Sequence, residues 1–307
     1  METGDHMSIS VIIPTLNAGD AIGPLLESLD RQTHRPLETI IIDSSSDDRT
    51  VDIVEQFKCR IKTIERREFR HGATRNLGAS FAQGDALVFL TQDSLPNGEQ
   101  FLARLVHPLQ TRVAAASTAR QIPGVVANPI ERFSRLYNYP EQSHLRSIKD
   151  LSDLGIKTYF FSNSAAAYDR EIFWSLNGFD ETVIAIEDME LCARLLNAGH
   201  ATAYTTEAQV IHSHNAALVE LFRRYFDTGV FHFQRKDLFS ELNSTKEGLR
   251  FIREASSFLV SNRYFKWIPR LFLESMVKWS AFRLGYNYSS WPTAINSKLS
   301  GTPFFWG

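Results

Sequence analysis

The chain has 307 residues, 43% of them hydrophobic, which is enough for a substantial core in one large domain or in one domain with an extension. Its 33 basic and 35 acidic residues leave a net charge of −2, so no overall field favours nucleic acid as a partner. Two cysteines without metal-ligand spacing predict core thiols in a reducing compartment.

The N-terminus lacks the pattern of a signal peptide, and no run of about 18 apolar residues is long enough to span a bilayer. We therefore expect a cytoplasmic protein, with the inner face of the cell membrane as a place where it can act peripherally. Residues 1–7, METGDHM, read as a cloning remnant and are excluded from the fold prediction.

Along the first 110 residues, short runs rich in Ile and Val alternate with amphipathic segments. Strands are expected at 8–14, 37–43, 61–65 and 86–90, and helices at 19–32, 47–57 and 72–83. This alternation is typical of an α/β fold, a Rossmann-like, mostly parallel sheet flanked by helices.

Polar residues follow three of these strands. They are Pro14, Thr15 and Asn17 after the first strand, Asp43 after the second, and Thr91, Gln92 and Asp93 after the fourth. In open α/β sheets the ligand lies beyond the carboxyl ends of the strands, so these residues are expected to meet in one crevice.

The two strand-end carboxylates suit different contacts. Asp43 can accept hydrogen bonds from a nucleobase or ribose, whereas Asp93 can hold Mg²⁺ or Mn²⁺ with phosphate oxygens and water as the other ligands. The alternative for any single Asp is that it ends a strand or caps a helix.

Arg75 lies within the third predicted helix, in the segment FRHGATRNLGA. Its planar guanidinium can bind a diphosphate, and Gly72 allows a close backbone approach. The alternative is a solvated helix arginine that pairs with an acid.

Two further groups of polar residues lie in the middle of the chain. Glu187 and Asp188 open a predicted amphipathic helix, where an acid can act as a general base or merely complement the helix dipole. His212 and His214 follow a predicted strand, and their spacing would place both imidazoles on one face near Asp93. Packed or surface histidines are the alternative, and zinc is disfavoured because no third soft ligand has suitable spacing.

Taken in chain order, four segments resemble the inverting glycosyltransferases of family 2, which have the nucleotide-diphospho-sugar fold called GT-A. They are VIIPTLNAG, IIIDSSSDDRT, FLTQDSLP and GFDE with the following EDMEL. The resemblance runs from about Ser8 to about His214. Within the family, FRHGATRN, LTQDS and IHSHNAAL look most like rhamnosyltransferases that use nucleotide-activated L-rhamnose.

The resemblance implies a GT-A catalytic domain at 8–214 and a C-terminal helical extension at 215–307. It implies transfer of a sugar, L-rhamnose from dTDP-L-rhamnose, to a hydroxyl of a surface polysaccharide or a lipid-linked glycan. The implied catalytic residues are Asp188 as the base and Glu187 as its orienting neighbour. The implied donor-binding residues are Pro14, Thr15, Asn17, Asp43, Arg75, Thr91, Gln92 and Asp93.

The implied metal ligands are Asp93, His212 and His214, on Mg²⁺ or Mn²⁺. Many relatives carry an acid at the position of Thr91, which contributes no charge here. A histidine of the HSH segment would supply the missing ligand, and His212 is favoured over His214 because it comes directly after the strand.

The region from Arg223 to Arg283 carries 12 basic and six acidic residues, with aromatic residues interleaved. Such helices can pack on the catalytic domain or on a second subunit, or lie at a membrane interface beside anionic lipid. Packing with self-association is slightly favoured. No recognition module is visible, so no nucleic-acid partner is expected.

Three other functions fit parts of the pattern. A family 2 transferase can use a UDP-hexose or a UDP-N-acetylhexosamine donor. A catalytically idle GT-A domain can bind a nucleotide or glycan, although such a module needs no carboxylate beside the acceptor. A nucleotidyltransferase usually has a Gly- and Arg-rich loop after the first strand, which PTLNAGD lacks.

Overall fold

The computed structural model describes residues 7–239 and 244–307, and the chain divides into two compact units. Unit 1 comprises Met1–Ile122, Pro140–Asp180 and Asp188–His212, and unit 2 comprises Pro123–Tyr139, Glu181–Glu187 and Ser213–Gly307. The cloning remnant predicted at 1–7 lies outside the described residues except for Met7.

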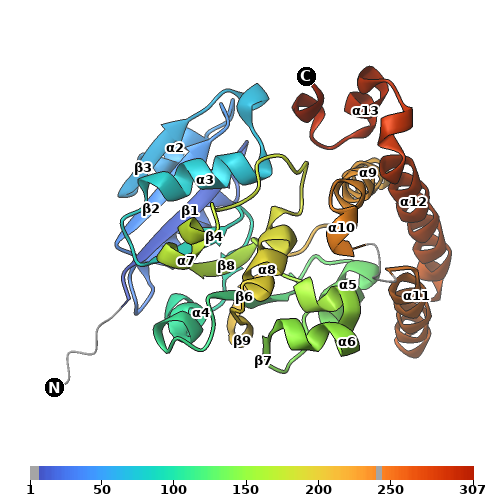
Figure 1. Cartoon of the computed structure of the whole chain (residues 1–307), viewed down its shortest axis with the longest axis horizontal. Coiled ribbons are helices and arrows are strands. Elements are labelled where there is room, and N and C mark those ends of the chain that lie inside the picture. The colour runs from blue at the N-terminus through green and yellow to red at the C-terminus, as the bar shows by residue number, and fades with distance from the viewer. Residues whose placement is uncertain (1–6, 240–243) are drawn as a thin grey trace. The chain divides into compact units, whose positions relative to one another are not determined.

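Unit 1 is built on one sheet (Figure 1). Its strands are β1 (Ile9–Thr15), β2 (Glu38–Asp43), β3 (Cys59–Thr63), β4 (Ala86–Leu90), β5 (Leu95–Pro96), β6 (Ala116–Ile122), β7 (His144–Arg146), β8 (Ala165–Asp169) and β9 (Thr202–Ile211). They lie in the order β3-β2-β1-β4-β8-β6-β9-β5, and β7 pairs with β9.

The first four strands confirm the predicted parallel arrangement, since β1 pairs in parallel with β2 and β4, and β2 with β3. Beyond β4 the sheet is mixed: β8 runs antiparallel to β4 and β6, while β6 and β9 are parallel. The alternating apolar pattern predicted only the parallel half, because β8 is a short Ala-rich strand, AAAYD, whose direction depends on distant pairing.

Helices cover both faces of the sheet in unit 1. They are α1 (Ile22–Asp30), α2 (Thr50–Val54), α3 (His71–Phe81), α4 (Phe101–Gln110), α6 (Leu151–Leu154) and α7 (Arg170–Ser175), followed by α8 (Glu187–Asn197), which begins at the boundary with unit 2. Successive side chains of a strand point to opposite faces. In β1, Val11 and Ile13 pack with Leu25 of α1, whereas Ile12 faces Gly78 of α3.

Gly78 lets α3 approach the sheet closely, because a Cβ there would clash with the side chain of Ile12. In Figure 1, α3 accordingly lies across β1 and β2. The predicted helices at 19–32, 47–57 and 72–83 are confirmed; each is shorter than predicted, and α3 begins one residue earlier, at His71.

Unit 2 is helical and consists of α5 (Pro129–Asn138), α9 (Leu218–Gln234), α10 (Lys236–Phe239), α11 (Ser244–Ser261), α12 (Ile268–Tyr286) and α13 (Thr293–Leu299). The 3₁₀ turns of the chain are η1 (Arg66–Glu68), η2 (Ile148–Asp150), η3 (Gly155–Tyr159), η4 (Phe265–Trp267), η5 (Tyr288–Ser290) and η6 (Pro303–Trp306).

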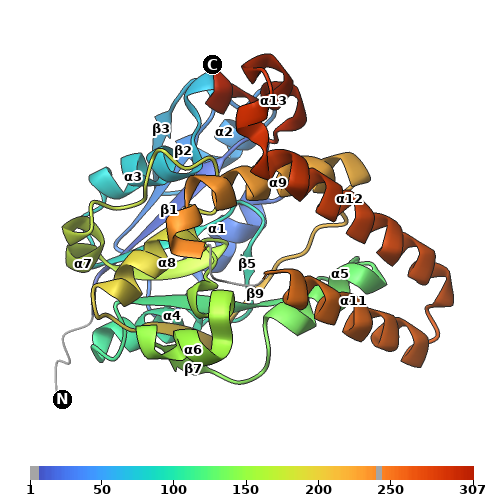
Figure 2. The same cartoon turned by 45° about the vertical axis from the view of Figure 1, so that its right-hand side comes forward.

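Helices α9 and α12 pack against each other, as Figure 2 shows. Gly229 of α9 and Gly285 of α12 lie at the crossing, where a Cβ on Gly285 would clash with the carbonyl oxygen of Phe226. The two backbones can therefore approach only because both positions are glycine.

A second cluster of unit 2 joins α5, α11 and α12 through Phe133, Leu259 and Leu271, with Trp267 packed against its edge. No helix within residues 7–239 and 244–307 combines the length and apolar character that a membrane span requires.

Candidate functional site

Strands β1 and β2 end side by side, because Thr15 and Asp43 are partners in their register. The parallel strand β4 ends at the same edge of the sheet, on the other side of β1. The polar residues that follow these three strands therefore share one edge, as the sequence predicts.

The side chain of Gln92 ties two of these strand ends together. Its Oε1 accepts a hydrogen bond from the backbone N–H of Leu16 at 2.8 Å, and its Nε2 donates to the Leu16 carbonyl at 3.1 Å. Pro14 lies within β1, and Asn17, with φ of 50°, accepts a hydrogen bond from the N–H of Asp47 at 3.0 Å. These contacts hold the loops after β1, β2 and β4 in fixed positions.

Asp43 is almost fully buried and is hydrogen-bonded by its own chain. Its Oδ1 accepts from the hydroxyls of Thr15 at 3.0 Å and of Ser46 at 2.6 Å, and its Oδ2 accepts from the Ser46 N–H at 2.9 Å. This carboxylate stabilises the loop after β2. The nucleoside contacts predicted for Asp43 and Thr15 remain predictions.

Asp93 lies in a tight turn directly after β4. The N–H of Ser94 donates to the Thr91 carbonyl at 3.0 Å, and the Thr91 and Ser94 hydroxyls lie 2.7 Å apart. The turn ends the strand and leaves the Asp93 side chain 33% exposed. Thr91 thus shapes the turn, which explains how a neutral residue fits that position.

His212 faces Asp93 from the end of β9. Its Nε2 lies 3.4 Å from Oδ1 of Asp93, and its side chain is only 7% exposed. The register of β6 and β9 places it there, since β9 ends at Ile211 opposite Ile122 and the His212 N–H donates to the Ile122 carbonyl at 3.1 Å. Both histidines lie just beyond the strand, so the one-face argument based on strand spacing does not apply to them.

Gln121 determines the orientation of the His212 ring. Its Nε2 donates to the Ser162 hydroxyl at 3.0 Å, so its Oε1 faces Nδ1 of His212 at 2.8 Å as an acceptor. Nδ1 therefore carries the proton of the neutral ring, and the lone pair of Nε2 points toward Asp93. Two acceptors facing each other require a proton or a cation between them.

His214 follows two residues later along the chain. One candidate ligand atom from each of Asp93, His212 and His214 lies within 4.8 Å of the others. Ligand atoms that share one cation lie close together, and Oδ1 of Asp93 and Nε2 of His212 are 3.4 Å apart. The donor set fits a divalent cation, and these three residues could hold one.

Asp188 lies in the first turn of α8. Its Oδ2 accepts the backbone N–H of Asn163 at 2.9 Å, and its Oδ1 accepts that of Met189 at 2.8 Å. The side chain remains partly exposed, whereas the neighbouring Glu187 is only 3% exposed. Of the two acids, Asp188 is therefore the one that a second substrate can reach.

Ile186, directly before this pair, has φ of +63°. A β-branched side chain is strained in this left-handed region, and such strain persists where the surroundings hold a residue in place for function. Ile186, directly before Glu187 and Asp188, is therefore a candidate functional position.

Arg75 is buried within α3, with 6% exposed, and its Nη1 donates to the His71 carbonyl at 3.0 Å. Its predicted contact with a diphosphate stays a prediction, since a buried guanidinium must become accessible for it.

Two supporting residues, Gln121 and Asn163, were missed by the sequence analysis. Neither belongs to a recognisable motif, and only the pairing of distant segments places them beside His212 and Asp188.

Comparisons with known proteins identify the family and the fold. Residues 10–176, more than half of the chain, match the family described as Glycosyl transferase family 2. The O-antigen chain rhamnosyltransferase RfbN of Salmonella typhimurium is 39% identical over 303 residues, which cover 98% of this chain and 96% of that protein. The O-antigen chain rhamnosyltransferase WbaN of Salmonella anatum is 39% identical over 97% of this chain and 96% of its own length.

Among solved structures, the fold resembles the mannosyltransferase PcManGT from Pyrobaculum calidifontis, solved in complex with GDP-Man and Mn²⁺. The TM-score is 0.64 at 17% identity, with 93% of this chain and 87% of that one covered. A fragment of Staphylococcus aureus TarS in complex with UDP matches with a TM-score of 0.53 at 16% identity over 92% and 91% of the two chains. The predictions of family, fold class and enzyme class are confirmed: the chain belongs to glycosyl transferase family 2 and is a glycosyltransferase with the GT-A fold.

Proposed function

We propose that this glycosyltransferase transfers L-rhamnose from dTDP-L-rhamnose to a hydroxyl of a surface polysaccharide or of a lipid-linked glycan. Two relatives named O-antigen chain rhamnosyltransferases support this choice of sugar, because they align with nearly the whole chain. The geometric observation that supports sugar transfer is the orientation of His212, whose Nε2 points at Asp93 beyond the end of β4.

Asp93, His212 and His214 would hold a divalent cation, Mn²⁺ or Mg²⁺. Imidazole is a better ligand for Mn²⁺ than for Mg²⁺, so we favour Mn²⁺. When bound, such an ion neutralises charge that develops on the diphosphate leaving group. Gln121 keeps the His212 ring in the tautomer that can bind it.

Asp188 is the proposed general base. It would take the proton of the acceptor hydroxyl as that oxygen bonds to the anomeric carbon and the bond from that carbon to the diphosphate breaks, which inverts the anomeric centre. The N–H groups of Asn163 and Met189 hold its carboxylate in place, and Glu187 would orient it from the buried side.

The donor would lie across the shared edge of β1, β2 and β4. Pro14, Thr15, Asn17 and Asp43 would face the nucleoside, Thr91 and Gln92 would shape the loop beside Asp93, and Arg75 would contact the diphosphate. We assign residues 8–214 to the catalytic domain and 215–307 to a helical extension for acceptor, membrane or subunit contacts.

A donor screen tests the sugar assignment. With Mn²⁺ present, dTDP-L-rhamnose should raise the melting temperature, because ligand binding stabilises the folded state by mass action. UDP-glucose and UDP-N-acetylglucosamine should raise it less. Stronger stabilisation by either UDP-sugar would contradict the rhamnose assignment, and donor binding without any transfer to glycan would favour an idle binding module.

Although the sequence slightly favours packing with self-association for this region, the exposed aromatic and cationic side chains of α12 lead us to propose instead that unit 2 contacts an anionic membrane through this helix. Phe272, Met276, Trp279 and Tyr286 lie on one face of this helix and are 50%, 61%, 66% and 37% exposed. Their spacing of three, four and seven residues makes one continuous stripe, the α12 stripe, which also contains Arg283. Apolar residues beside cations, in a region with six excess positive charges, match the chemistry of an anionic lipid surface.

Vesicle co-sedimentation tests this contact. The protein should bind vesicles that contain phosphatidylglycerol, and raised salt should release it. Trp279→Ser should weaken binding severalfold, whereas Leu249→Ser, which removes an equally exposed residue of α11, should not. Concentration-dependent dimerisation that Trp279→Ser abolishes, with no vesicle binding, would instead assign the stripe to a second copy of the chain.

A further inference from the structure

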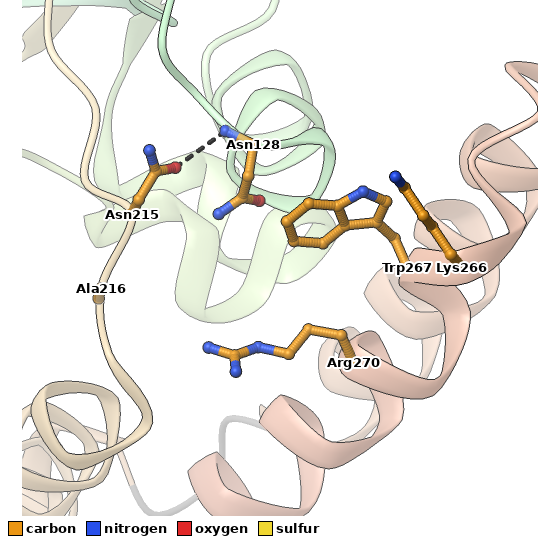
Figure 3. A pocket seen from close by; sticks show the side chains of 6 residues that line it. All are labelled: Asn128, Asn215, Ala216, Lys266, Trp267 and Arg270. Carbon is orange, nitrogen blue, oxygen red and sulfur yellow. Dashed lines mark hydrogen bonds between the residues drawn. The ribbon is translucent and has the colours of Figure 1, made fainter.

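A pocket of about 490 Å³ in unit 2 is lined by Asn128, Asn215, Ala216, Lys266, Trp267 and Arg270. Its two cations do not converge, since in Figure 3 the ammonium of Lys266 and the guanidinium of Arg270 lie on different sides of the Trp267 indole. Nε of Arg270 also pairs with the buried Glu274 at 2.7 Å. Polar groups that do converge lie in unit 1, around the three residues before β8.

These three residues, Ser162, Asn163 and Ser164, form a turn that we call the pre-β8 turn. The N–H of Ala165 donates to the Ser162 carbonyl at 3.4 Å, and the hydroxyl of Thr118 in β6 donates to the same carbonyl at 3.1 Å. Asn163 is only 2% exposed, whereas both serines are partly exposed. The turn is therefore fixed to the sheet, with its central residue buried.

The pre-β8 turn bonds to the residues that support the candidate metal ligands. The hydroxyl of Ser162 accepts from Nε2 of Gln121 at 3.0 Å, and this is the amide that orients His212. The carbonyl of Ser164 accepts the N–H of Thr91 at 3.2 Å, at the start of the turn after β4. Both serines of the turn thus contact the metal side of the proposed site.

Asn163, between the two serines, contacts the proposed base. Its backbone N–H donates to Oδ2 of Asp188 at 2.9 Å, and its Oδ1 accepts the hydroxyl of Tyr168 at 2.8 Å. Tyr168 is 1% exposed, and the centroid of its ring lies 5.4–5.7 Å from those of Phe89, Phe161, Phe173 and Phe179. The ring is held by packing alone, so its hydroxyl is a fixed donor to Asn163.

We propose that Tyr168 is a positioning residue for the transfer reaction, which acts through Asn163 to hold the Asp188 carboxylate in place relative to the metal ligands. The inference rests on the proposed function for the roles of the base and the metal. The pre-β8 turn makes hydrogen bonds to the turn after β4, to β6 and to α8, so it links the elements that carry both. A general base must stay within hydrogen-bond reach of the proton it takes, and a displacement of about 1 Å can cost roughly 100-fold in rate.

Tyr168→Phe is the sharpest variant, because it removes one hydroxyl and leaves the packed ring in place. With dTDP-L-rhamnose as donor, Mn²⁺, and a lipid-linked glycan fraction from membranes as acceptor, kcat should fall roughly 10- to 100-fold. The Kd for the donor and the Mn²⁺ affinity should stay unchanged, since neither the strand ends nor the metal ligands lose a contact. Release of dTDP and calorimetric titration measure these quantities.

Tyr204→Phe is the matched control. Tyr204 of β9 is 7% exposed, and its hydroxyl donates to the Pro140 carbonyl at 2.7 Å, away from the pre-β8 turn. Each variant loses one hydrogen bond of a buried hydroxyl, so the two melting temperatures should fall by similar amounts. Only Tyr168→Phe should lower kcat, which separates positioning from stability.

Two further variants locate the effect within the turn. Asn163→Ala keeps the backbone N–H but removes the anchor, so it should lower kcat about as much as Tyr168→Phe. The double variant should be no slower than the slower single variant, because both residues act through one hydrogen bond. Ser162→Ala removes the partner of Gln121 instead, and it should weaken Mn²⁺ affinity by roughly threefold to tenfold.

Normal kcat in Tyr168→Phe, with a melting temperature lowered as in Tyr204→Phe, would leave Tyr168 a structural role only and overturn the proposal. A double variant that loses the product of the two single losses would also contradict it. A loss of Mn²⁺ affinity in Tyr168→Phe as large as in Ser162→Ala would connect Tyr168 to the metal instead of the base.

Hydrogen exchange of the Asn163 amide tests the same contact without any donor. This amide should exchange faster in Tyr168→Phe than in Tyr204→Phe, and equal exchange in the two variants would overturn the proposal. Absence of transfer from dTDP-L-rhamnose by the unaltered protein would contradict the proposed donor. The exchange result would then still decide whether Tyr168 holds Asn163 against Asp188.

Discussion

Asp43 and Asp93 each end or follow a strand at the same edge of the sheet, yet their surroundings differ. Asp43 is 1% exposed and accepts hydrogen bonds from Thr15 and Ser46. Asp93 is 33% exposed at its side chain and faces Nε2 of His212. The first carboxylate is satisfied by its own loop, whereas the second faces another acceptor and needs a cation or a proton.

The two carboxylates differ in their surroundings because the loops that carry them make different contacts. The loop after β2 turns back so that Ser46, three residues on, bonds the carboxylate locally. The turn after β4 is closed by Thr91 and Ser94 without the Asp93 side chain, which therefore projects toward β9. A strand-end carboxylate thus becomes a ligand candidate when the turn that follows does not use it.

Asp188 extends the comparison to a third carboxylate, and its replacement should have the largest effect. Asp188→Asn keeps the shape and the contact with Asn163 through one oxygen but removes the base, so transfer should fall by roughly 10² to 10⁴. Donor affinity should hardly change, because a base that touches only the acceptor acts in the transition state. Turnover and donor titrations measure both quantities.

Glu187→Gln is the control for Asp188→Asn, and as a change in an orienting neighbour it should cost less. A dipole-complementing helix acid without a catalytic role would lose about 1 kcal/mol of stability or less and keep near-normal turnover. Normal turnover in Asp188→Asn would remove this residue from the mechanism.

Asp93→Asn tests the exposed member of the pair directly. It keeps size but removes the charge that a hard cation requires, so donor binding should lose its dependence on Mn²⁺.

His212→Ala should weaken metal binding more than His214→Ala, because Gln121 orients the His212 ring. Loss of that support in Gln121→Ala should cost roughly 10- to 100-fold in metal affinity. Calorimetric titration with Mn²⁺ measures all four, and equal activity with metal and with chelator would show that Asp93 has another role.

Asp43→Asn should have the smallest effect on metal binding and should act on stability instead. An amide can replace only one of the two acceptor oxygens, so the Ser46 contacts are partly lost at about 1–3 kcal/mol. Each kcal/mol lowers the melting temperature by roughly 2–4 °C in a chain of this kind. The Mn²⁺ affinity should stay unchanged, and a loss of metal binding as large as in Asp93→Asn would erase the distinction between the two carboxylates.

The sequence by itself determined the elements whose signals are local. The Ile- and Val-rich runs predicted β1 to β4, and the residues that follow three of them marked the edge where Asp43, Asp93 and their neighbours meet. Alternation of apolar runs with helical periodicity sets this part of the fold, because each strand and helix is recognisable within its own segment. The order of the motifs was enough to predict the family.

Only the tertiary structure decided what each polar residue faces. Pairing of β6 with β9 brings Gln121 and His212 together across 91 positions of sequence, and the turn after β4 directs Asp93 toward them. The same holds for the direction of β8 and for the burial of Arg75. These features depend on contacts between segments that are distant in the sequence. Such contacts form only when the sheet forms, so they cannot be predicted from a local pattern of residues.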